Sequence, residues 1–96
     1  MVQLTERASA ELQRLLVDHV ARPQQAIRLR LNEVGDLRMT IDVPHPGDSV
    51  IRQDFVPVLI IDARLAVRLS MRVLDFSSGT GGGFKLGWRS ATPSTP

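Results

Sequence analysis

Residues 26–43 have the sequence AIRLRLNEVGDLRMTIDV, in which apolar and polar residues alternate on both sides of a short polar stretch. Alternation with a period of two is typical of strands that bury one face. Directly opposed residues of a hairpin share a face, so the two apolar sets must pair with each other. This condition predicts an antiparallel hairpin with Leu31 opposite Leu37. The loop is then residues 33–35, in which Gly35 is free to take a positive φ.

A helix is predicted before the hairpin, over residues 5–21. Thr5 is suited to the N-cap and Pro23 stops the helix. The apolar residues recur at helical spacing: Ala8, Leu12, Leu15, Leu16 and Val20.

Short strands are predicted after the hairpin. A type II turn at residues 45–48 precedes strands near 50–51, 56–61, 71–76 and 84–88, and Asp62 is suited to cap a short helix over 63–69. One long helix with many short strands predicts an α+β domain, mostly antiparallel, with its N-terminal helix packed on a two-layer β domain. We expect a single domain over residues 1–89 and a disordered tail over 90–96.

Composition narrows the class of protein. The chain has 96 residues, 43% of them hydrophobic, and it contains no cysteine, so disulfides are excluded. No apolar run approaches the ~20 residues that span a bilayer, and the first residues do not resemble an export signal, so we expect a cytoplasmic protein. The formal net charge is only +2, and nearly all of the basic residues are arginine.

Catalytic signatures are weak, and we expect no enzyme and no cofactor. The glycine-rich stretch 77–83 lacks the lysine and the following helix of a phosphate loop. His19 lies near the edge of the helix's apolar stripe, and no cysteine nucleophile exists. His45 with Asp42 and Asp48 could form a weak metal site, but a solvated turn histidine is the simpler interpretation because the spacing matches no metal motif.

Two further features concern binding surfaces. Trp88 alternates with Phe84 and Leu86, which favours a core-facing or dimer-facing role over an exposed anchor.

The hairpin register also places Arg30 opposite Arg38, with Arg28 on the same face. Opposed like charges cost free energy, which Asp36 and Asp42 could relieve. The alternative is that Arg28, Arg30 and Arg38 form a site for a phosphate, a nucleic acid or an acidic protein surface.

Several short motifs, taken in order, resemble the A-type iron–sulfur carrier family (HesB/IscA-like). They are Leu4-Thr5 before the first helix, Gly47-Asp48, the segment 62–69, Val73-Leu74-Asp75-Phe76 and Gly81-Gly82-Gly83-Phe84-Lys85-Leu86. The resemblance implies a HesB-like β domain and a tendency to form homodimers.

The same resemblance places the family's three ligand cysteines where this chain has none. The first would lie in the turn at Val34-Gly35-Asp36, and the last two would lie within residues 92–96. We therefore expect a non-catalytic interaction or scaffold protein, which could be tied to iron–sulfur assembly through a protein partner or its own dimer. The alternative is a small binding module that uses its arginine face for nucleic acid or another anion.

Overall fold

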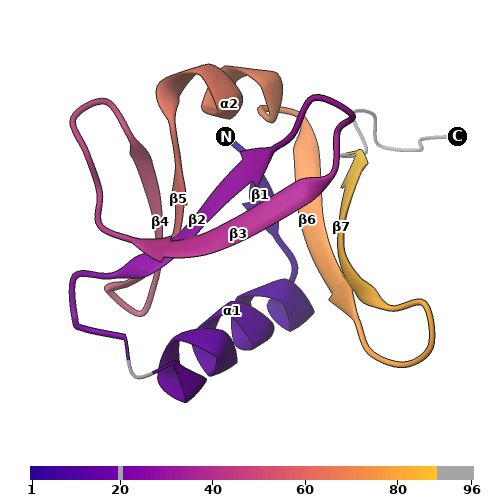
Figure 1. Ribbon diagram of the computed structural model, residues 1–96, viewed down its shortest axis with the longest axis horizontal. Coiled ribbons are helices and arrows are strands. Elements are labelled where there is room, and N and C mark those ends of the chain that lie inside the picture. Colours follow the sequence, from indigo (N-terminus) through magenta and orange to yellow (C-terminus); the bar gives the residue numbers. More distant parts are fainter. Residues whose placement is uncertain (20, 89–96) are drawn as a thin grey trace, which may run out of the picture.

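The computed structural model describes residues 1–19 and 21–88, which form two helices and seven strands (Figure 1). The elements follow one another as β1 (Gln3–Leu4), α1 (Glu6–Asp18), β2 (Ala26–Leu31), β3 (Leu37–Asp42), β4 (Ser49–Gln53), β5 (Val56–Ile61), α2 (Ala63–Arg68), β6 (Arg72–Ser77) and β7 (Gly83–Trp88). The predicted tail, residues 90–96, lies outside the described residues, as does Val20.

Helix α1 begins where the sequence predicts and ends earlier. The Thr5 hydroxyl accepts a hydrogen bond from the Ala8 N–H, which confirms Thr5 as the N-cap. The helix ends at Asp18 rather than at residue 21. The N–H of Ala21 donates to the carbonyl of Leu16, five residues back, so the i→i−4 pattern is lost before Pro23 is reached.

One sheet contains the predicted hairpin. Its strand order is β3-β2-β5-β4, and Leu31 is paired with Leu37 in the predicted register. The loop also agrees with the prediction, since Gly35 has φ +91° and its N–H donates to the Asn32 carbonyl. The turn at 45–48 closes with a bond from the Asp48 N–H to the His45 carbonyl, and Gly47 has φ +87°.

The second sheet has the order β1-β6-β7 and faces the first across the core. Figure 1 shows α1 at one end of both sheets and α2 at the other. Helix α1 and both sheets contribute fully buried side chains to the core: Leu12 from α1, Leu29 and Leu59 from the first sheet, and Leu74 from the second. The α+β, two-layer prediction is therefore confirmed.

Two strand pairs are parallel, β1 with β6 and β2 with β5, and the other three are antiparallel. The sheets are mixed rather than purely antiparallel. The β2–β5 pair needs no crossover helix, because β3 and β4 lie between its strands in the sequence and carry the chain across the sheet. Neither described helix is long and apolar enough to cross a membrane.

Candidate functional site

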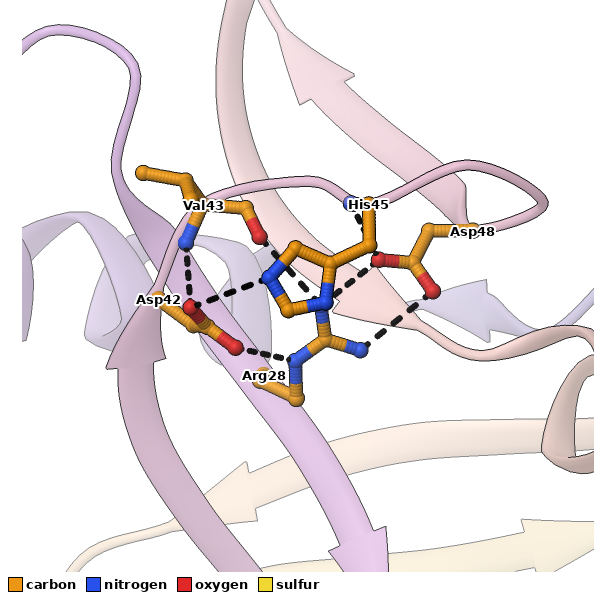
Figure 2. Close-up of polar contacts among 5 residues, drawn as sticks. All are labelled: Arg28, Asp42, Val43, His45 and Asp48. Carbon is orange, nitrogen blue, oxygen red and sulfur yellow. Dashed lines mark hydrogen bonds and ion pairs between the residues drawn. The ribbon is translucent and has the colours of Figure 1, made fainter.

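Arg28 does not belong to an open arginine cluster. Its side chain on β2 is only 4% exposed. Nε lies 2.6 Å from Oδ2 of Asp42, and Nη2 lies 2.6 Å from Oδ2 of Asp48 (Figure 2). Nη2 also donates to the carbonyl of Val43 at 3.3 Å. These acceptors occupy the donors that a phosphate or an acidic partner would use.

The position of Arg28 follows from the sheet topology. Strands β3 and β4 lie on opposite edges of their sheet, so the connection between them, residues 43–48, must cross β2 and β5. Arg28 on β2 contacts Asp42 and Val43 where this connection begins and Asp48 where it ends. The network therefore fixes the crossover connection, and its role is structural.

Charge stabilises the network. The side-chain hydrogen bond from Arg28 lowers the pKa of Asp48 below its usual value, against the opposing effect of burial. The pKa of Asp42 is also lowered, first by the backbone N–H of Val43 and then by Arg28. Both carboxylates raise the pKa of Arg28. All three groups are therefore charged at neutral pH.

Arg30 and Arg38 occupy the predicted register directly opposite each other, and both are exposed. The structure separates them from Arg28, which is buried against the crossover connection. Binding of an anion by Arg30 and Arg38 stays a prediction, without Arg28 as a ligand.

His45 lies beside the network as the sequence suggested. Its Nε2 is 3.7 Å from Oδ1 of Asp42, and its backbone N–H donates to Oδ2 of Asp48. Both carboxylates are directed at Arg28, so a metal would have to compete with a buried guanidinium. Within residues 1–19 and 21–88, no group of three potential metal ligands is close enough to hold an ion.

The turn after β2 is held by its own side chain. Asn32 Oδ1 accepts from the N–H of Val34 and from that of Asp36, at 3.1 and 2.8 Å. Val34 is 80% exposed at the tip. This turn presents carboxylates at Glu33 and Asp36 but neither a thiolate nor an imidazole.

The glycine-rich stretch 77–83 is a tight turn between β6 and β7. The Gly82 N–H donates to the Gly79 carbonyl, and a Cβ on Gly82 would lie 2.3 Å from the Ser77 carbonyl oxygen. The chain then enters a strand, as the sequence predicts.

Trp88 is not core-facing. The side chain is 74% exposed within one copy of the chain, and the guanidinium carbon of Arg72 lies 4.1 Å from its ring centroid. Arg72 is held in place by bonds to the carbonyls of Leu86 and Gly87, each at 3.0 Å. The core-facing interpretation is wrong because Trp88 is the last residue of an edge strand, opposite Arg72 rather than an apolar residue.

The sequence reasoning missed the basic residues that the fold brings toward Arg30. Arg64 and Arg68 on α2 line one hollow with Arg30, and Arg68 lines a second with Arg72 and Lys85. The available signal was the four-residue spacing of Arg64 and Arg68, which places both on one face of a helix.

Solved structures give the comparison that decides the fold. IscA with a 2Fe–2S cluster superposes with a TM-score of 0.63 and 28% sequence identity, covering 92% of this chain and 85% of the other. The chain has the A-type iron–sulfur carrier fold. No protein-family model and no curated protein gives a significant match to the sequence.

Two more structures share the A-type fold at lower identity. Escherichia coli SufA, involved in the biosynthesis of iron–sulfur clusters, has a TM-score of 0.62 and 18% identity, covering 91% of this chain and 84% of its own. A protein from Aquifex aeolicus has a TM-score of 0.64 and 20% identity, covering 90% of this chain and 89% of its own.

An iron–sulfur cluster does not fit the donors of this chain. Clusters are held chiefly by cysteine thiolates, and the sequence contains no cysteine. The turn 32–36, where the resemblance places the first cysteine, offers only the carboxylates of Glu33 and Asp36. The chain keeps the fold without the ligands.

Proposed function

We propose that the protein is a non-catalytic interaction or scaffold protein linked to iron–sulfur cluster assembly, which acts through protein contacts and holds no cluster. One observation carries the proposal: the chain has the fold of IscA and SufA without a single thiol. A fold retained without its ligands can still present a binding surface to partners.

The absence of cluster binding is tested by anaerobic reconstitution with iron and sulfide, followed by desalting. We expect a colourless protein, while IscA treated in the same way serves as the positive control. A stoichiometric visible absorption band retained after desalting would overturn this part of the proposal.

The link to assembly is tested by a pull-down with the tagged protein and quantitative mass spectrometry. We expect proteins of iron–sulfur assembly to be enriched over a tag-only control. If none is enriched, the proposed link to iron–sulfur assembly is wrong, while the fold is unaffected.

A surface for self-association lies at the β4–β5 turn, and we call it the Phe55 face. Phe55 is 96% exposed. Beside it, a largely apolar groove between the end of α1 and the β4–β5 hairpin is lined by residues that include Leu16, Val17 and Val56. A projecting ring beside an apolar groove is self-complementary, which is the property that a two-fold dimer interface requires.

Two charged residues favour binding of a second copy of the chain to the Phe55 face. Arg22 and Asp54 both line the groove, and neither forms a salt bridge with a described residue. A two-fold axis through the groove would place Arg22 of one copy near Asp54 of the other.

Charge reversal tests the dimer. We expect light scattering after size exclusion to show weakened dimers for Arg22→Asp and for Asp54→Arg, and a restored dimer for the double variant. Arg52→Asp, an exposed control outside the groove, should leave the dimer unchanged. A monomeric wild-type protein at high concentration would refute the dimer.

A further inference from the structure

Although the net charge is low, the fold separates the arginines that are paired with carboxylates from the cations that are not. Three arginines are neutralised by carboxylates: Arg7 by Asp75, Arg14 by Glu11 and Asp18, and Arg28 by Asp42 and Asp48. These pairs lie along α1 and at the crossover connection, so the cations that remain unpaired are concentrated elsewhere.

Most of the cations outside these pairs, among the residues that the structure describes, line two adjoining hollows that share Leu31 and Arg68. We call them together the basic groove. It runs from α2, at the top of Figure 1, past the β2–β3 turn to the edge strand β7 at the right. Five cations line it: Arg30, Arg64, Arg68, Arg72 and Lys85.

Little negative charge opposes these cations. Asp62 and Asp36 are the acidic residues among the groove's lining. Oδ1 of Asp62 already accepts the N–H of Leu65 at 2.8 Å as the cap of α2. No salt bridge to a described residue is formed by Arg30, Arg64, Arg68 or Lys85. The groove is therefore positive along its length.

An aromatic surface stands at the β7 end of the groove. Arg72 lines the groove and stacks on Trp88, with its guanidinium carbon 4.1 Å from the ring centroid. Its Nε and Nη2 are held by the carbonyls of Gly87 and Leu86, which fixes the guanidinium beside the ring. Trp88 stays 74% exposed, so much of its indole remains open for stacking.

We infer that the basic groove binds single-stranded nucleic acid, with phosphates along the arginines and a base stacked on Trp88. A cationic groove that tracks the backbone, joined to an exposed aromatic on which bases stack, is the arrangement by which proteins bind single strands without sequence preference. An acidic peptide would use the charges but would leave the indole without a role. This inference does not depend on a link to iron–sulfur assembly.

Trp88 supplies a direct probe, because it is the only tryptophan of the chain. Titration with a short oligothymidylate should quench its fluorescence saturably at low salt, since a stacked base contacts the indole. Polyglutamate of matched charge should bind more weakly and leave the fluorescence unquenched. Equal quenching by polyglutamate would assign the groove to an acidic protein and overturn the proposal.

Matched variants locate the site. Arg64→Gln with Arg68→Gln should lower the affinity for labelled oligothymidylate roughly ten-fold or more. Arg7→Gln with Arg52→Gln removes the same charge from exposed positions that line neither the basic groove nor the apolar groove of the Phe55 face, and should have little effect. Each phosphate that the groove variant no longer neutralises should reduce the slope of log K against log salt by about 0.7.

Trp88→Ala tests stacking separately from charge. It should weaken binding by roughly five-fold or more, because a stacked base contributes substantially to single-strand affinity, and should leave the salt slope unchanged. Equal losses of affinity in the groove and control variants, or no saturable binding at low salt, would contradict a defined site. Circular dichroism checks that each variant folds.

Discussion

Nη2 of Arg28 lies 2.6 Å from Oδ2 of Asp48, which ties β2 to the far end of the crossover connection between β3 and β4. Both side chains are nearly inaccessible, at 4% and 6% exposure. Arg28→Met should therefore lower the free energy of unfolding by about 3–5 kcal/mol, because it leaves a buried carboxylate uncompensated. Urea denaturation measures the loss. Arg38→Met, at an exposed position on the neighbouring strand, should change stability little.

The same network predicts a dependence of stability on acid. The pKa of Asp48 and of Asp42 is lowered in the folded state, so each carboxylate contributes stability that is complete above its ordinary pKa near 3.8. That stability is lost as the pH falls through the lowered folded-state pKa. Thermal melts from pH 6 down to pH 2 should show a steep loss below about pH 4.

Asp48→Asn tests which group is responsible. The variant should be less stable than the wild type at pH 6, and its melting temperature should fall less between pH 6 and pH 2. A variant with the same pH profile as the wild type would show that other carboxylates dominate acid unfolding.

The hairpin register could be derived from the sequence because two apolar sets with a period of two can share a face in one register only. The burial of Arg28 could not be derived from the sequence, because it depends on the path of residues 43–48 across the sheet, which is a tertiary feature. The same holds for the basic groove. Arg30 and Arg68 are far apart in the sequence, and only the packing of α2 against the β2–β3 hairpin brings them to one hollow.

The apolar face of α1 predicts unequal effects for two leucines. Leu12 is completely buried, whereas Leu16 is only partly buried beside the groove of the Phe55 face. Leu12→Ala should cost about 2–5 kcal/mol, the range for a buried leucine, and Leu16→Ala should cost clearly less. Denaturant titration compares the two. If Leu16→Ala were the more damaging change, α1 would be rotated from the position described.

Two glycines of the β6–β7 hairpin should respond to alanine in opposite ways. A Cβ on Gly82 would lie 2.3 Å from the Ser77 carbonyl oxygen, so Gly82→Ala must displace the backbone and should cost about 1–3 kcal/mol. A Cβ on Gly87 would meet its nearest atom at 4.0 Å. Gly87→Ala should therefore be neutral or slightly stabilising, because alanine restricts the unfolded chain. Equal melting temperatures for the two variants would count against the tight turn.

The β4–β5 turn stores strain at Phe55. Asp54 and Phe55 both have positive φ, at 52° and 70°. This is the geometry of a two-residue turn that favours asparagine, aspartate or glycine, and a bulky side chain adopts it only at a cost. The 96% exposure of Phe55 means that the ring gains almost no burial within one copy of the chain in return.

Comparison of two small residues at position 55 isolates this strain from any contact of the ring. Phe55→Ala removes the ring but keeps a Cβ in the left-handed region, whereas Phe55→Gly removes both. Glycine avoids a cost of about 1–2 kcal/mol but loses more conformational freedom on folding, so Phe55→Gly should be more stable than Phe55→Ala by about 0.5–1 kcal/mol. Urea denaturation at a protein concentration low enough to keep every variant monomeric measures the difference. If Phe55→Ala were as stable as Phe55→Gly, the turn would not hold residue 55 in the left-handed region.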